Sequence, residues 1–146
     1  MKLTVLFVDD DPNVIQGLRR MLRGMREQWE TLFAGSGEEA LAVMKAQPVD
    51  VIVADMRMPG MDGATLLTKV RELYPQVVRI MLSGHSDQEL VLRAAKSAHQ
   101  FLAKPCDAET LRYTIERACR LRKLFQNEDL LQAAAGITTL PSLPAL

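Results

Sequence analysis

The chain has 146 residues, 48% hydrophobic and 25% charged, which is enough for one domain with a sizeable core. Its formal net charge is zero, so we expect no direct binding to nucleic acid or to an anionic membrane. No apolar run approaches the roughly 20 residues that span a bilayer. Two cysteines without a CxxC pattern favour a reducing cytoplasm over a disulfide or metal framework.

Short apolar, β-branched runs alternate with longer helical patterns along the chain. The runs lie at residues 3–8, 30–35, 49–54, 77–82 and 100–103. Continuous apolar runs of this length are typical of strands that are buried on both faces of a parallel sheet. We therefore predict five parallel strands.

Between and after these strands, apolar residues recur at three- and four-residue steps, which predicts five helices. Proline suits the first position of a helix, and serine or aspartate suits its N-cap. These start signals are Pro12, Ser36 with Glu39 as in a capping box, Asp62, Ser86 or Asp87, and Asp107. Strand and helix alternate five times, which predicts an α/β fold, a three-layer (βα)5 doubly wound parallel sheet with helices on both faces.

The last part of the chain differs in composition. Residues 137–146 are mostly apolar and include two prolines, with no partner visible in the sequence. We interpret residues 1–123 as the domain, 124–136 as a helical linker and 137–146 as the start of a further domain that is truncated here. An apolar tail that folds back on the first domain is the alternative.

Polar residues gather where four of the five predicted strands end. Asp9 and Asp10 follow the first strand, Asp55 the third, Ser83 the fourth and Lys104 the fifth. Ligands of open parallel sheets bind outside the carboxyl ends of the strands, near a switch in strand order. Because a chance distribution would scatter such groups over both edges, we expect these side chains to form one site.

The residue types at these strand ends favour phosphoryl chemistry. Crowded carboxylates repel one another unless a cation lies among them, and oxygen ligands favour Mg²⁺ over zinc. A divalent cation, the Lys104 ammonium and the Ser83 hydroxyl together suit a phosphoryl group. Asp55 is central and can attack phosphorus to give an acyl phosphate. Ser83 activated by Lys104 is the other nucleophile that could be argued.

Each of these residues has a simpler structural interpretation when it is taken alone. The acids at residues 9–11 could cap the first helix, although three acids exceed what a cap requires. Asp55 could be a loop-entry residue, Ser83 a turn residue and Lys104 a solvated side chain. The functional interpretation leads only because all of them fall at one edge of the sheet.

Four segments of the chain resemble the receiver domain of bacterial two-component response regulators, the domain that chemotaxis regulators also contain. They are FVDDDP (7–12), VIVADMRMPGMDG (51–63), MLSGHSD (81–87) and FLAKP (101–105), in the expected order within residues 3–123. The resemblance implies a flavodoxin-like fold with strand order 2-1-3-4-5. It also implies a signalling switch, phosphorylated by a histidine kinase or a small phosphodonor, that catalyses only its own phosphorylation and dephosphorylation.

The resemblance assigns a phosphoacceptor and a metal site. Asp55 would accept the phosphoryl group. Asp10, Asp55 and the backbone carbonyl of Arg57 would bind Mg²⁺ directly, and Asp9 would act partly through water.

The resemblance also assigns a switch. Ser83 would donate a hydrogen bond to one phosphoryl oxygen, Lys104 would pair with another, and Phe101 would be the aromatic switch residue, where the family often has tyrosine. The face made by the fourth helix, fifth strand and fifth helix would then change, pair as a homodimer and control a C-terminal output domain. The end of the tail, LPSLPAL (140–146), resembles the opening of HD-type output domains.

Two other functions stay open at this point. A phosphatase with an aspartyl nucleophile also uses Asp and Mg²⁺, but such enzymes usually place an acid where this chain has Arg57. A docking module that works without phosphorylation, a pseudo-receiver, is disfavoured by the intact Asp55, Ser83 and Lys104. A dinucleotide-binding domain ranks lowest, because no GxGxxG motif follows the first strand.

Overall fold

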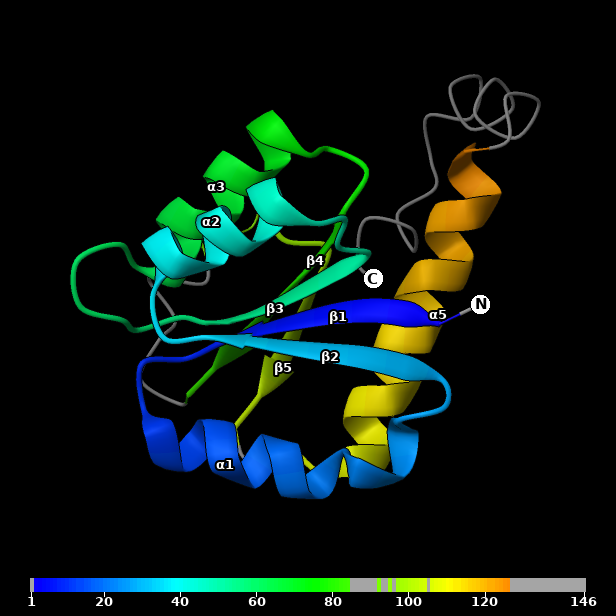
Figure 1. The fold of residues 1–146 in the computed structure, drawn as a ribbon. Coiled ribbons are helices and arrows are strands. Elements are labelled where there is room, and N and C mark those ends of the chain that lie inside the picture. Colours follow the sequence, from blue (N-terminus) through cyan, green and yellow to red (C-terminus); the bar gives the residue numbers. More distant parts are fainter. Residues whose placement is uncertain (1, 85–91, 93–94, 96, 105, 127–146) are drawn as a thin grey trace.

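The computed structural model describes residues 2–84, 92, 95, 97–104 and 106–126 of the chain. Five parallel strands form one sheet in the order β2-β1-β3-β4-β5, as shown in Figure 1. Most of the predicted fourth helix and the tail from residue 127 onward lie outside the described residues. Within the described part of the chain, no helix is long and apolar enough to cross a membrane.

The helices and strands follow the predicted order. The strands are β1 (Leu3–Val8), β2 (Trp29–Ala34), β3 (Val51–Asp55), β4 (Val78–Ser83) and β5 (Gln100–Ala103). The helices are α1 (Pro12–Met21), the short 3-10 helix η1 (Arg23–Met25), α2 (Gly37–Ala46), α3 (Gly63–Leu73) and α5 (Ala108–Gln126). The fold class and the strand order are confirmed, and the strand boundaries differ from the predicted ones by at most two residues.

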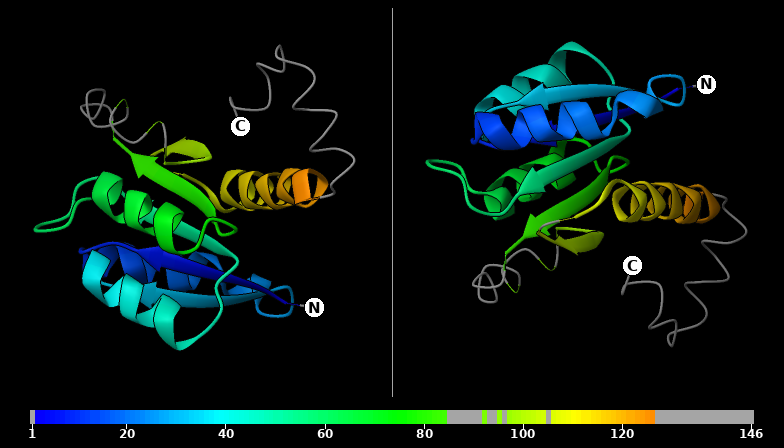
Figure 2. Two further views of the ribbon diagram at one scale, coloured as in Figure 1. Left: turned by 90° about the horizontal axis from the view of Figure 1, so that it is seen from above. Right: turned by 90° about the horizontal axis from the view of Figure 1, so that it is seen from below.

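The sheet separates two apolar clusters. Helices α2 and α3 cover one face, and α1 and α5 cover the other, as the two views in Figure 2 show. Strand β1 contributes to both clusters, because its side chains alternate between the two faces of the sheet. Leu6 and Val8 face the α2–α3 side, while Val5 and Phe7 face the α1–α5 side. All four side chains are at most 1% exposed. Burial on both faces explains why the strands are apolar runs rather than alternating patterns.

Side-chain caps begin four of the helices where the sequence predicted them. Asp11 accepts from the amide of Asn13 at 2.9 Å and so caps α1. Ser36, Asp62 and Asp107 cap α2, α3 and α5 in the same way. Because Asp11 alone caps α1, the neighbouring Asp9 and Asp10 are available for another role.

The start of α3 lies against the strand end that carries Asp55. The amide of Gly63 donates to the carbonyl of Met56 at 2.9 Å. A Cβ at position 63 would overlap the carbonyl oxygen of Asp55 and lie 3.0 Å from the Cα of Met56. Both neighbours are backbone atoms that cannot move aside cheaply, so only glycine allows this close approach.

We predict that Gly63→Ala lowers the free energy of unfolding by about 1–3 kcal/mol, because the added methyl group overpacks a backbone contact. Gly17→Ala is the matched control, since a Cβ at position 17 of α1 meets nothing within 4 Å. Removing a helical glycine there should raise stability by roughly 0.5–1 kcal/mol. Urea denaturation measures both changes, and equal stabilisation by the two substitutions would contradict the close approach at Gly63.

Candidate functional site

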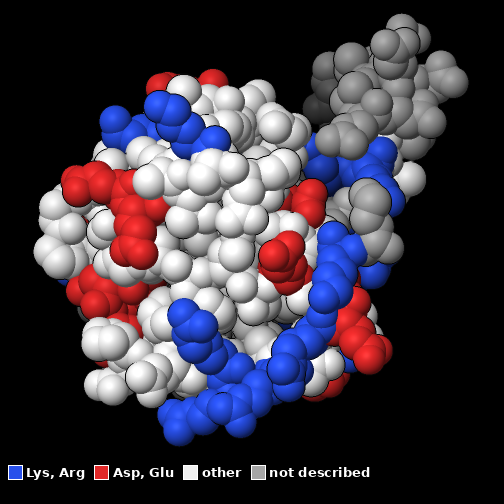
Figure 3. All heavy atoms as spheres, viewed as in Figure 1, with Lys and Arg blue, Asp and Glu red and all other residues white. Residues whose placement is uncertain are grey.

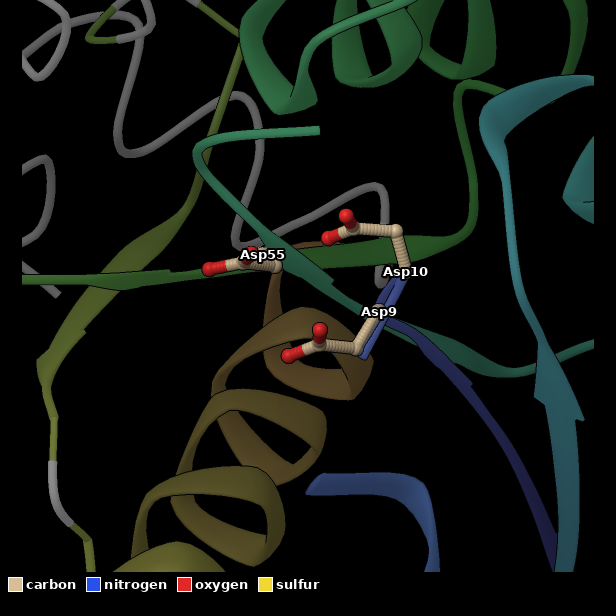
Figure 4. A group of neighbouring side chains, drawn as sticks. All are labelled: Asp9, Asp10 and Asp55. Atoms are coloured by element: carbon tan, nitrogen blue, oxygen red, sulfur yellow. The ribbon is translucent and has the colours of Figure 1, made fainter. Parts of the chain in front are cut away.

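Three aspartates converge at the carboxyl ends of two neighbouring strands. Strands β1 and β3 pair in register up to Val8 and Ala54, so the next residues, Asp9 and Asp55, lie side by side. Oxygen atoms of Asp9, Asp10 and Asp55 lie within 4.8 Å of one another, and Figure 4 shows the three side chains pointing toward a common space. Asp9 is 3% exposed and Asp55 is 7% exposed, whereas Asp10 is exposed to solvent.

A lysine that follows β5 forms ion pairs with two of these acids. The Nζ of Lys104 pairs with Oδ1 of Asp55 and lies 3.5 Å from Oδ2 of Asp9. Its amide donates to the carbonyl of Ser83 at 2.9 Å, which ties the end of β5 to the end of β4. Ser83 is the last residue of β4 and is half-buried. The structure therefore brings the predicted strand-end residues together at one edge of the sheet.

Burial and neighbouring charges act in opposite directions on the pKa values of Asp55 and Lys104. Burial is the main cause that raises the pKa of the Asp55 carboxyl, and the charges of Asp9 and Asp10 add to it, while the hydrogen bond from Lys104 acts to lower it. Burial also acts to lower the pKa of Lys104, but its contacts with Asp55 and Asp9 outweigh burial and raise that pKa. Lys104 therefore remains a cation at neutral pH.

The donor set at this edge fits a hard divalent cation. One oxygen of Asp9 accepts from the amide of Asp11 at 2.9 Å, but its Oδ2 is buried and has no hydrogen-bond partner among the described residues. The nearest cation to this oxygen is the Lys104 ammonium at 3.5 Å, so a buried carboxylate oxygen without a hydrogen bond, beside two further carboxylates, leaves a place for an ion or a water. Oxygen ligands with few carboxylates suit Mg²⁺. Acidic side chains also gather where β1 and β2 end, at the left of Figure 3.

The remaining predicted residues lie around this edge. Arg57 is exposed in the loop after β3, where with Met58 and Asp62 it lines a hollow of about 350 Å³. Phe101 is half-buried on β5, in register with Met81 of β4, and packs against the apolar cluster on the α2–α3 side. His85 lies outside the described residues.

Gly63 is the residue near Asp55 to which the sequence analysis gave no role. A glycine directly after the helix cap Asp62 was the available signal, because a good helix former is usual at that position.

The family model of the response regulator receiver domain matches residues 5–116 of this chain. The chain belongs to this family. It is 38% identical over 123 residues to the hydrogenase transcriptional regulatory protein HoxA of Cupriavidus necator, covering 83% of this chain and 25% of that protein. It is 35% identical over 115 residues to the DNA-binding transcriptional regulator NtrC of Salmonella typhimurium, covering 78% of this chain and 24% of that protein. The receiver thus spans about a quarter of the length of these relatives.

Solved structures of receivers agree with this assignment. A receiver domain protein from Clostridium thermocellum is 29% identical with a TM-score of 0.76, covering 84% of this chain and 98% of that chain. The signal receiver domain of an HD domain-containing protein from Pseudomonas fluorescens Pf-5 is 27% identical with a TM-score of 0.78, with the same coverage of 84% and 98%.

Family membership settles the broad class of the protein. Receiver domains belong to two-component systems, where they are signalling switches and not classical enzymes. They generally bind Mg²⁺ through acidic residues, and this receiver has such a cluster. They partner with histidine kinases and output domains, and the relatives named above are larger regulators.

We predict that Lys104→Met lowers the free energy of unfolding at pH 7 by about 1–3 kcal/mol, because two buried carboxylates lose their nearest cation. The measurement is urea denaturation without divalent cations. Lys69→Met replaces an exposed lysine of α3 and should change stability by no more than about 0.5 kcal/mol. Equal effects of the two substitutions would mean that Lys104 does not balance the acids.

Proposed function

We propose that this receiver is a phosphoacceptor switch in which Asp55 accepts a phosphoryl group from a histidine kinase or a small phosphodonor. The observation that carries the proposal is the convergence of the buried Asp55 carboxylate with Asp9, Asp10 and the Lys104 ammonium. Asp9, Asp10, Asp55 and the backbone carbonyl of Arg57 would hold Mg²⁺. When bound, the ion would neutralise charge on the phosphoryl oxygens.

The chain's own residues have distinct parts in the transfer. A carboxylate oxygen of Asp55 forms the new bond to phosphorus, and the donor atom leaves with the electron pair of the bond that breaks. Lys104, which pairs with Asp55 before transfer, moves onto a phosphoryl oxygen afterwards. The hydroxyl of Ser83 donates to another phosphoryl oxygen. Lys104 and Ser83 thus hold the phosphoryl group on Asp55. The transfer uses Asp55 as its one protein nucleophile.

The same contacts explain how one modification would change a surface. Phosphorylation adds about −1.5 to −2 charge and three strong acceptors. A hydrogen bond from Ser83 to that charged group is worth roughly 1.5–3 kcal/mol, which shifts a two-state equilibrium about tenfold or more. Movement of Ser83 opens space for the ring of Phe101. The face formed by the fourth helix, β5 and α5 then changes.

The switch would control a domain that follows the receiver in the chain. Residues 1–123 form the receiver, 124–136 a helical linker and 137–146 the start of an output domain of HD type. The greater length of the relatives and the HD domain-containing structural neighbour support an output domain. A homodimer across the fourth helix, β5 and α5 and a cytoplasmic location belong to the same proposal. Helix α5 continues to Gln126, three residues past the proposed boundary.

The phosphoacceptor is tested by incubation with acetyl phosphate and Mg²⁺ followed by mass spectrometry. We expect one phosphoryl adduct, and we expect its loss in Asp55→Asn, which removes the attacking oxygen. Asp50→Asn is the matched control, because Asp50 is an exposed acid that precedes the same strand. An adduct that persists in Asp55→Asn would refute the assignment, and multiple turnover of a small phosphoester would favour a phosphatase.

The metal site is tested by comparing two neighbouring acids. We expect Asp10→Asn to weaken Mg²⁺ binding about tenfold or more, because the site loses a charged ligand. Asp11→Asn should change Mg²⁺ affinity less than about threefold, since Asp11 caps α1 and asparagine caps equally well. Calorimetric titration with MgCl₂ measures both affinities. Equal losses would show that binding follows overall charge and not the proposed ligands.

A further inference from the structure

A basic side chain is buried near the start of β4, at the end of the strand opposite the acidic edge. Arg79 is the only charged residue of β4 and is 6% exposed. Removing a guanidinium from water is costly unless its donors are satisfied. Among the described residues, no carboxylate lies within 4.0 Å of this guanidinium. An ion pair with a described residue therefore does not explain its burial.

Main-chain carbonyls from two separate segments hold the guanidinium instead. Its Nε donates to the carbonyl of Ser97 at 2.5 Å, and its Nη1 donates to the carbonyls of Val77 at 3.1 Å and Pro75 at 3.2 Å. The Pro75 carbonyl also accepts from Nη2 of Arg122, on α5, at 2.6 Å. Arg79 thus joins the loop before β4 to the segment that leads into β5, and α5 contacts the same loop.

His99 completes this connection at the start of β5. Its amide donates to the carbonyl of Arg79 at 2.7 Å, and its ring Nδ1 accepts from the amide of Arg79 at 2.8 Å. Burial, followed by the charges of Arg79 from β4 and Arg122 from α5, lowers the pKa of His99 to about 4. The ring is therefore neutral at pH 7, and its Nε2 lies 3.4 Å from Nη2 of Arg79.

The contact lies in the same row of side chains as the proposed switch. Alternate residues of a strand share a face, so Arg79, Met81 and Ser83 form one row along β4. Phe101 is the register partner of Met81, and His99 lies two residues before Phe101. Phe101 consequently stands between Ser83, at the acidic edge, and the contact of Arg79 with His99 at the other end.

We propose that Arg79 and His99 form a clamp that positions β5 and keeps Phe101 in its resting place until Asp55 is phosphorylated. This inference rests on the proposed function, in which Phe101 is the switch ring. Strand β5 has four residues and lies at the edge of the sheet. The amide of Lys104 anchors one end to Ser83, and the clamp anchors the other. Removing the Arg79 side chain leaves this end of β5 held only by its main-chain pairing with β4, while the other end lies beside the residues that phosphorylation moves.

The resting position of β5 is tested by amide hydrogen exchange of the unphosphorylated chain. Arg79→Met should speed exchange of the Phe101 and Leu102 amides on the order of tenfold, with much smaller changes at Ile52 of β3, because the loss of the clamp is local. Arg79→Lys should not restore protection, since an ammonium cannot reach three carbonyls as the guanidinium fork does. Arg117→Met, at an exposed position of α5, is the control. A uniform change across the sheet, or full rescue by lysine, would overturn the clamp.

Two substitutions of His99 test the clamp without removing a buried charge. In His99→Asn the amide oxygen takes the place of Nδ1 as acceptor, so β5 should keep its protection, whereas His99→Ala should lose it. The two also differ from wild type in their pH dependence. Unfolded His99 takes up a proton near pH 6.5 and the folded residue only near 4. Wild-type stability should therefore fall between these pH values more than that of His99→Asn. Equal protection or equal slopes would overturn the role of the ring.

The link to the switch is tested by NMR with beryllofluoride and Mg²⁺, which mimic the phosphoryl group. We expect the resting β5 resonances of Arg79→Met to lie part of the way toward the wild-type beryllofluoride positions, and the remaining change on addition to be smaller. Resting positions identical to wild type would overturn the clamp. If the wild-type spectrum does not respond to beryllofluoride, the proposed function fails, while the exchange measurements still decide whether Arg79 anchors β5.

Discussion

The crowding of buried carboxylates beside a single lysine is the constraint on which the rest of this receiver depends. Asp9 and Asp55 are almost fully buried at neighbouring strand ends, and Lys104 contacts both. Burial and the neighbouring acids disfavour the charge of Asp55, and Lys104 offsets only part of that cost, so the pKa of Asp55 is raised. An edge of this kind is short of positive charge, so it favours a divalent cation, and in the proposed function an added phosphoryl group would draw Lys104 away from Asp55.

The parallel sheet produces this crowding of acids, and a helix cap and a glycine beside the site maintain it. Pairing of β1 with β3 puts their ends side by side, and pairing of β4 with β5 brings Ser83 and Lys104 to the same edge. Asp11 caps α1 and leaves Asp9 and Asp10 free of that task. Gly63 lets α3 begin against the backbone of Asp55. A rigid frame of this kind allows a small change at the site to become a discrete movement elsewhere.

The two ends of strand β4 differ in a way that would decide how β5 moves in the proposed switch. One end of its α3-facing row is Ser83 at the acidic edge, and the other is Arg79, whose guanidinium is held by carbonyls. Phe101 lies between them on the neighbouring strand. In the mechanism proposed above, charge is added at one end of this row while the other end stays anchored, so β5 would pivot rather than slide. The contact of Arg122 with Pro75 extends the anchored end to α5.

The sequence by itself determined the α/β class, the five strands and the edge at which their polar residues meet, because alternation and strand ends are local features that a parallel sheet converts into one site. Only the tertiary structure separated the three consecutive acids into the cap Asp11 and the pair Asp9 and Asp10, since capping depends on backbone angles. It alone also explained Arg79, a charge within an apolar run: its carbonyl partners lie just before β4 and, 18 residues further along the chain, at Ser97, and only the folded chain brings these two segments together.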